Sequence, residues 1–146
     1  MKRAILILCI LCTVSLAGYS PGERVLYIPA GTKINPFDRI FDAVAMVESN
    51  MNPNAYNKKE NSVGIIQIRE IRIKDFNNQT KSKYKLVEMY DPIKSKSVFM
   101  YYAKRIGHQY PEKIIRCWNG GENGMRYRQT KQYYQKVSLH LNKKLK

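Results

Sequence analysis

The chain has 146 residues, a formal net charge of +15 and three cysteines. This length suggests a single domain, and so basic a surface is attracted to polyanions. His108 and His140 are isolated, without the spacing of metal ligands, and neither a Gly-rich phosphate loop nor a nucleophilic triad pattern is present. The sequence therefore gives no support for a metal site, a phosphate-loop enzyme or a triad hydrolase, and we expect no cofactor.

Residues 1–17 predict a secretory signal peptide. Lys2 and Arg3 precede an apolar run from Ala4 to Leu11, which continues weakly to Ala17. This run is shorter than the roughly 20 apolar residues that span a bilayer, and a basic start before it is typical of an export signal. We expect cleavage before Gly18 and no stable membrane span afterwards.

Cysteine usage agrees with export to a bacterial-type envelope. Once residues 1–17 are removed, Cys117 has no partner for an intrachain disulfide, and we expect it to be a buried small hydrophobic residue rather than a nucleophile. Lipoprotein processing at Cys9 or Cys12, or an uncleaved anchor, is the alternative to cleavage. The predicted location is the periplasm, the cell envelope or the medium, where the anionic polymer is the cell wall. Export therefore argues against nucleic acid as the partner of the basic surface.

After a lead-in over residues 18–35, the first helix is clearly marked. Asn35 can cap it, Pro36 suits its first turn, and Asp38 faces the positive end of the helix dipole. The segment from Asn50 to Pro53 ends it. Apolar residues recur on one face at helical spacing: Phe37, Ile40, Phe41, Val44 and Val47.

The next segments are less regular. Residues 63–76 are apolar with a mixed period, and we predict a tight turn at Gly64 followed by a helix to about Phe76. Residues 77–90 are polar and are expected to form a loop. Asp91 and Pro92 begin another helix, which Gly107 ends.

Two more helices follow. Pro111 begins one that passes through Trp118 and ends at Gly120–Gly121, and Thr130 is expected to cap the last. The apolar face of this last helix holds Tyr134, Val137, Leu141 and Leu145. Together these patterns predict a mainly α single domain of about five or six helices, with at most a short hairpin or strand.

Glu48 stands out because it shares the apolar face of the first helix with Phe41 and Val44. Burial there would raise its pKa, since the charged form loses hydration. A carboxyl that stays protonated near neutral pH is what cleavage of a glycosidic bond requires. The alternative is a glutamate at a fraying helix end that turns out to water.

Two other pairs suggest ligand contacts. Gly64 would let the backbone approach a ligand, and the amide of Gln67 can donate and accept hydrogen bonds. Trp118 and Asn119 put an aromatic face beside an amide, a common pairing in carbohydrate sites. The alternatives are a turn glycine with a surface amide, and a core tryptophan before an ordinary helix end.

Taken together, five motifs over residues 36–137 resemble the catalytic domain of soluble lytic transglycosylases, in the goose-type lysozyme superfamily. The motifs are Glu48-Ser49 with Pro53 and Ala55, Gly64–Ile68, Asp91-Pro92, Trp118–Gly121 and Tyr133–Val137. The resemblance implies a mainly α, lysozyme-like catalytic domain (transglycosylase SLT) over residues 36–146, with a peptidoglycan groove.

The resemblance also implies roles for individual residues. Glu48 takes the position of the catalytic glutamate, and Tyr133 that of a tyrosine which approaches this acid. The implied substrate-binding residues are Ser49, Asn57, Gln67, Trp118, Asn119 and Tyr133. The chain departs from the family where Trp118 replaces the usual tyrosine, and where the stretch from Pro53 to Gly64 is one residue longer, with Asn57 in place of the usual serine.

The predicted function is that of a peptidoglycan lytic transglycosylase, which cleaves the bond from N-acetylmuramic acid (MurNAc) to N-acetylglucosamine (GlcNAc) and leaves 1,6-anhydro-MurNAc. We expect a monomer whose partners are peptidoglycan glycan strands. One alternative is a hydrolytic muramidase, with Glu60 or Asp75 as the second carboxylate that activates water. Another is a non-enzymatic basic module that binds the cell wall.

Overall fold

The computed structural model describes residues 35–142. The predicted signal peptide, nearly all of the lead-in, and Leu145 lie outside these residues. The predicted mainly α architecture is confirmed. The elements in chain order are α1 (Pro36–Ser49), β1 (Tyr56–Asn57), β2 (Ser62–Val63), β3 (Ile68–Arg69), α2 (Glu70–Thr80), the 3₁₀ helix η1 (Leu86–Tyr90), α3 (Pro92–Ile106), α4 (Pro111–Gly120), the 3₁₀ helix η2 (Gly124–Arg126) and α5 (Arg128–Leu141).

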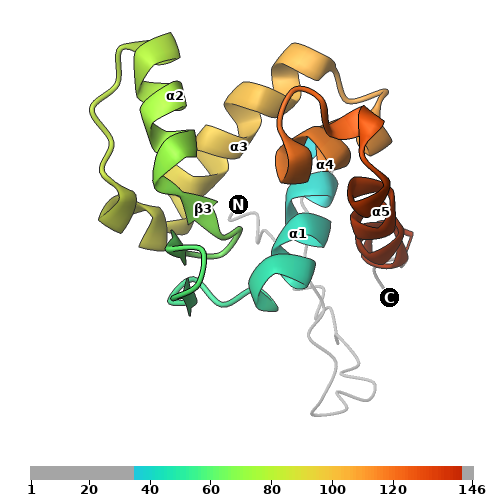
Figure 1. Ribbon diagram of the computed structural model, residues 1–146, viewed down its shortest axis with the longest axis horizontal. Coiled ribbons are helices and arrows are strands. Elements are labelled where there is room, and N and C mark those ends of the chain that lie inside the picture. Colours follow the sequence, from blue (N-terminus) through green and yellow to red (C-terminus); the bar gives the residue numbers. More distant parts are fainter. Residues whose placement is uncertain (1–34, 143–146) are drawn as a thin grey trace, which may run out of the picture. The chain divides into compact units, whose positions relative to one another are not determined.

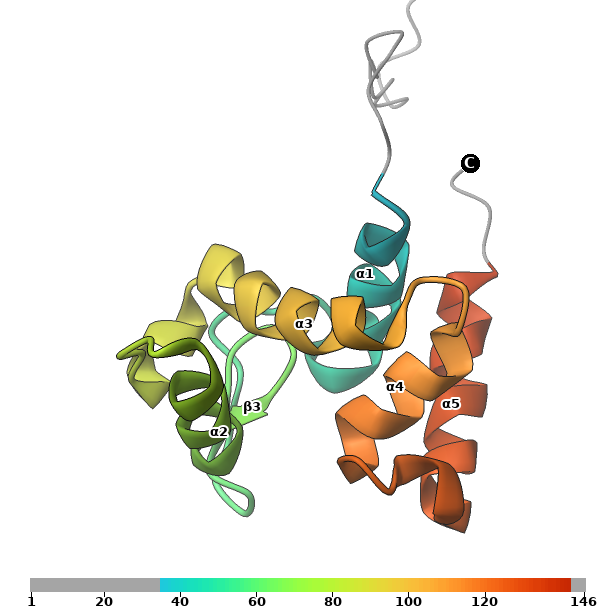
Figure 2. The same cartoon turned by 90° about the horizontal axis from the view of Figure 1, so that it is seen from above.

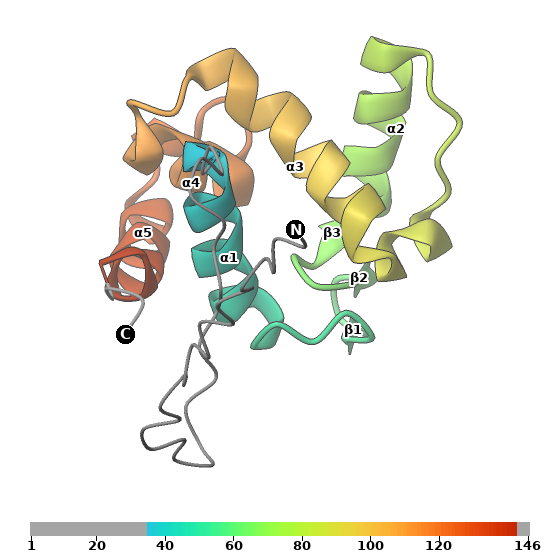
Figure 3. The same cartoon turned by 180° about the vertical axis from the view of Figure 1, so that it is seen from behind.

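Helix α3 runs between two groups of elements. On one side lie α2, η1 and the three short strands, which pair in the antiparallel order β1-β2-β3 (Figures 1 and 3). On the other side lie α1, α4 and α5, and α5 packs against both α1 and α4 (Figure 2). This arrangement places the end of α1 near residues of α5 that are remote in sequence.

The predicted caps of α1 and α3 are confirmed. The Asn35 side chain accepts a hydrogen bond from the backbone N–H of Phe37 at 3.1 Å, and Asp91 accepts one from Ile93 at 2.8 Å. Helix α1 ends at Asn50, whose φ of 53° is left-handed. A side-chain oxygen that satisfies a free N–H of the first turn explains why these helices begin where they do.

The helix predicted between Gly64 and Phe76 was wrong in its first half. Strand β2 leads into a turn at Gly64, β3 follows, and α2 begins at Glu70 and continues to Thr80. Gly64 has a φ of +81°, and a Cβ there would lie 2.0 Å from the carbonyl oxygen of Met89. Ile65, Ile66 and Ile68 are buried because the turn is packed on η1, so their burial carries no helical period, whereas Ile71 of α2 is exposed.

Two further expectations need correction. Residues 77–90 are not simply a loop, because α2 extends to Thr80 and η1 occupies Leu86–Tyr90. Thr130 does not cap α5, which begins at Arg128 without a side-chain cap. Thr130 is instead buried in the first turns of α5, where its hydroxyl accepts a hydrogen bond from Nε of Arg116 at 3.3 Å.

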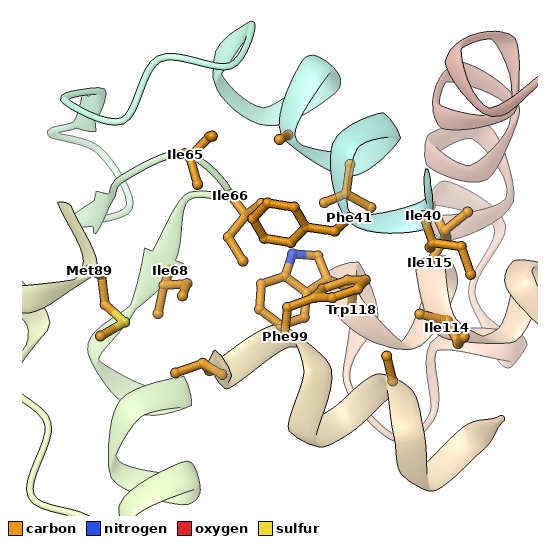
Figure 4. Close-up of a cluster of buried hydrophobic side chains, with 14 of the residues drawn as sticks. Ile40, Phe41, Ile65, Ile66, Ile68, Met89, Phe99, Ile114, Ile115 and Trp118 are labelled. Carbon is orange, nitrogen blue, oxygen red and sulfur yellow. The ribbon is translucent and has the colours of Figure 1, made fainter. Parts of the chain in front are cut away.

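An aromatic group forms the centre of the core. Phe99 of α3 packs edge-on against Phe41 of α1 and against Trp118 of α4, with ring centroids 5.5 and 5.2 Å apart. Figure 4 shows these three rings together, with Ile66 from the turn beside them. The core therefore joins α1, α3 and α4 to the turn that precedes β3, and so fixes both walls of the site described next.

Candidate active site

A cleft of about 830 Å³ is lined mainly by residues of β3, α2, α3 and α4, together with the segment that leads from α4 into α5. Its volume lies in the range of ligand-binding sites, roughly 300–1,000 Å³. Glu48 at the end of α1 and Glu60 from the β1–β2 connection also line it.

Glu48 is held in the protonated form at unusually high pH. Burial raises its pKa from the ordinary 4.5 to about 7, because the charged form loses hydration, and the nearby negative charge of Glu60 adds to this rise. The hydrogen bond from Tyr133 and the positive charge of Arg69 oppose it. At neutral pH this carboxyl can therefore both release and accept a proton.

Tyr133 fixes the orientation of Glu48. Its hydroxyl donates a hydrogen bond to Oε1 of Glu48 at 2.6 Å. Burial and the charge of Glu48 raise the pKa of Tyr133 far above its ordinary value, so the hydroxyl remains a donor. The contact depends on the packing of α5 against α1, to which Arg39 contributes by donating from Nη2 to the carbonyl of Leu141 at 2.9 Å.

Gln67, Ser49 and Asn57 lie in different surroundings. Gln67 lines the cleft, but its amide nitrogen donates to the carbonyl of Gly64 at 2.9 Å and its oxygen accepts from the hydroxyl of Ser62 at 3.0 Å. Ser49 donates to the carbonyl of Ile65 at 2.7 Å. Neither Ser49 nor the exposed Asn57 is among the residues of 35–142 that line the cleft. Gly64 was expected to let the backbone approach a ligand, but in the structure it lies against the backbone of η1 at Met89.

Helix α4 supplies one wall. Trp118 lines the cleft but is only 8% exposed, so most of its indole belongs to the core, as in the alternative considered for it. Asn119 lines the cleft and is exposed. Cys117 also lines it and is half-buried, which corrects the expectation of a fully buried cysteine.

The opposite wall contains groups that were not predicted from the sequence. Arg72 and Tyr102 line the cleft, and the Tyr102 hydroxyl donates to Oδ2 of Asp75 at 2.5 Å. The Arg72 guanidinium lies over the rings of both Tyr102 and Trp118, 4.7 and 4.8 Å from their centroids. Arg72 is one of five charged residues in segment 63–76, so no sequence signal distinguished it.

Within residues 35–142, no group of three or more His, Cys, Asp or Glu side chains is placed to hold a metal ion. In the same part of the chain, no helix combines the length and apolar character needed to cross a membrane.

A protonated, half-buried glutamate beside a long cleft is the arrangement of enzymes that cleave glycosidic bonds. The family model of the Transglycosylase SLT domain matches residues 28–140, and the chain belongs to this family. The family acts on peptidoglycan by cleavage of the lytic transglycosylase type. No curated protein and no solved structure matches the chain.

Proposed function

We propose that this chain is a peptidoglycan lytic transglycosylase that cleaves the MurNAc–GlcNAc bond and forms 1,6-anhydro-MurNAc. The observation that carries this proposal is the state of Glu48, a carboxyl in the cleft with a pKa of about 7 and one fixed hydrogen bond from Tyr133. A group with this pKa can act as acid and as base in one catalytic cycle.

The reaction begins with the protonated form of Glu48. Its proton passes to the oxygen that links C1 of MurNAc to GlcNAc, and the C1–O bond breaks as this oxygen leaves as a hydroxyl. Positive charge develops at C1, and the carboxylate formed at Glu48 is stabilised by the hydroxyl of Tyr133.

The same carboxylate completes the cycle. It accepts the proton of the MurNAc C6 hydroxyl, whose oxygen forms the new bond to C1. No water is consumed, and Glu48 is protonated again. Because the nucleophile belongs to the same sugar, its effective concentration is high and a second carboxylate is not required.

The test is mass analysis of a digest of purified sacculi. The wild-type protein should release muropeptides that end in anhydro-MurNAc, and Glu48→Gln should release none. Glu70→Gln is the matched control, because Glu70 is exposed and is not among the cleft-lining residues. Products one water heavier, with a reducing end, would exclude the transglycosylase reaction.

One observation favours a hydrolytic muramidase as the second candidate. Glu60 lines the same cleft, and its charge acts on Glu48. In a muramidase Glu60 would activate a water molecule, so Glu60→Gln would abolish activity as completely as Glu48→Gln. Under the transglycosylase mechanism Glu60→Gln retains activity. Binding to sacculi without turnover, unchanged in Glu48→Gln, would indicate a wall-binding module.

The remaining predictions extend this proposal. We propose that Asn119 and the exposed edge of Trp118 contact the glycan, since both line the cleft. Ser49 and Gln67 were predicted to bind the substrate. We propose that they act on it indirectly, by holding the turn at residues 64–67 beside Glu48. Export through residues 1–17 would bring the domain to peptidoglycan.

A further inference from the structure

Arg72 of α2 is a charged residue of the cleft wall that is held against aromatic rings. Its guanidinium is stacked against Tyr102 and Trp118, and Nη2 donates to the carbonyl oxygen of Trp118 at 2.7 Å. Two aromatic contacts and one hydrogen bond hold the group in a single position. A guanidinium fixed in this way loses little conformational entropy when it binds a ligand.

The charge of Arg72 has no ion-pair partner within residues 35–142. The three ion pairs in this part of the chain involve other residues, and the nearby carboxylate of Asp75 accepts the hydrogen bond of Tyr102. Burial lowers the pKa of Arg72, because its charge loses hydration, and Tyr102 and Asp75 offset only part of this fall. Half-buried charges of this kind are normally paired, so an anion in the cleft would gain from contact with it.

The Arg72 guanidinium also has N–H groups that can donate hydrogen bonds to a ligand. Nη2 forms the one hydrogen bond of good geometry from this guanidinium to the described residues, and the Tyr102 hydroxyl lies close enough to favour its charged form. Because Arg72 lines the cleft, a ligand bound there can reach its guanidinium. Two adjacent N–H groups of an arginine match the two oxygens of a carboxylate.

We propose that Arg72 is a specificity-determining residue that binds a carboxylate of the glycan substrate through its guanidinium. This inference rests on the proposed function. In peptidoglycan the carboxylate is that of the peptide stem, or, on MurNAc residues from which the stem has been removed, that of the lactyl group. Neutral glycans of N-acetylglucosamine lack both, so Arg72 makes the cleft select for the acidic polymer.

The test compares Arg72→Gln with wild type on three substrates: intact sacculi, glycan strands stripped of stems by an amidase, and sacculi whose carboxyls have been converted to methylamides. On the substrate that carries the bound carboxylate, intact sacculi for the stem or stripped strands for the lactyl group, kcat/KM should fall roughly tenfold or more, the value of a hydrogen bond to a charged group. On the methylamide substrate the two proteins should be equal. An effect on intact sacculi that is lost on stripped strands assigns a stem carboxylate. An effect that is largest on stripped strands, where the amidase has freed the lactyl carboxyl, assigns that group.

Arg72→Lys and Arg39→Gln complete the set. Arg72→Lys keeps the charge and should recover part of the loss on acidic substrates only. Arg39 also donates from Nη2 to a backbone carbonyl, that of Leu141, but it does not line the cleft, so Arg39→Gln should leave substrate preference unchanged. An equal loss of activity on acidic and neutral substrates in Arg72→Gln would reduce Arg72 to a packing role and overturn the proposal.

Failure of the proposed function can be distinguished from failure of this inference. If the wild type turns over no glycan, the proposed function is wrong. Affinity for soluble stem-bearing strands, for stripped strands and for the methylamides of both, measured by calorimetry in the Glu48→Gln background, still tests Arg72. A preference for either acidic strand over its methylamide that Arg72→Gln removes supports the inference, and equal binding of both acidic strands and their methylamides contradicts it.

Discussion

The pKa of Glu48 determines the pH range in which this chain can donate a proton. With a pKa of about 7, the protonated fraction of Glu48 falls as pH rises through 7. We expect kcat/KM on sacculi to decline above this pH. Glu60→Gln removes a charge that raises the pKa of Glu48, so the declining limb should move to lower pH. A limb that stays in place in Glu60→Gln would show that another group controls it.

Tyr133→Phe should shift the same limb in the opposite direction. The Tyr133 hydroxyl stabilises the carboxylate form of Glu48, so its removal raises the pKa of Glu48 further. We expect the limb to move to higher pH and kcat to fall about tenfold or more, because a hydrogen bond to a charge is lost. Tyr134→Phe is the matched control on the neighbouring position of α5. An unchanged pH profile in Tyr133→Phe would contradict the role of this contact.

The raised pKa of Glu48 also lowers the stability of the fold in a defined pH window. Between about 4.5 and about 7 the folded state keeps a proton that the unfolded state has lost, so stability falls as pH rises through this window. Glu48→Gln should therefore stabilise the domain above pH 7, by at most about 3 kcal/mol, and have little effect at pH 4. Urea unfolding at both pH values measures the difference. Equal effects at the two values would exclude this origin.

At the scale of elements, the turn between β2 and β3 carries the largest steric constraint. Gly64→Ala places a Cβ 2.0 Å from the carbonyl of Met89 at a φ of +81°. We expect a loss of roughly 3 kcal/mol or more in urea unfolding, because backbone strain and a clash add. Gly121→Ala is the control, since Gly121 also has a positive φ but nothing within 4 Å of its Cβ position. The prediction fails if the two variants lose equal stability.

Some elements could be predicted from the sequence because their start signals are local. Helices α1, α3 and α4 begin at a proline, and in α1 and α3 an Asn or Asp cap precedes it, so the signals are local. The strands contain two residues each, too few for an alternating pattern to appear. Threonine is a common N-cap residue, which is why Thr130 was predicted to cap α5. Its partner Arg116 lies in another helix, and no local pattern connects the two residues.

The residues of the site also differ in how far the sequence could predict them. The face of α1 on which Glu48 lies follows from helical spacing, which is why its burial could be predicted. The contact with Tyr133 joins residues 85 apart in sequence, and only the family resemblance indicated it. The position of Arg72 depends on how α2 packs opposite α4, which no local pattern encodes.

At the scale of the whole molecule, the excess positive charge of residues 35–142 lies outside the cleft. The cleft lining has four basic and four acidic residues: Arg69, Arg72, Arg105 and Lys113, and Glu48, Glu60, Asp75 and Glu122. The formal net charge of the chain is nevertheless +15. The surplus therefore acts on the approach to a polyanion, at distances that salt screens, more than on the reacting bond.

This separation predicts a specific salt dependence. Raising ionic strength from about 0.05 to about 0.5 M shortens the screening length severalfold, so KM for intact sacculi should rise while kcat stays constant. Turnover of short, uncharged glycan fragments should be unaffected. Replacing exposed lysines outside the cleft, Lys83, Lys104 and Lys136, by Gln should weaken the salt effect without changing kcat. If salt lowered kcat equally on both substrates, the excess positive charge would act on the reacting bond within the cleft. That result would contradict the assignment of this charge to the surface outside the cleft.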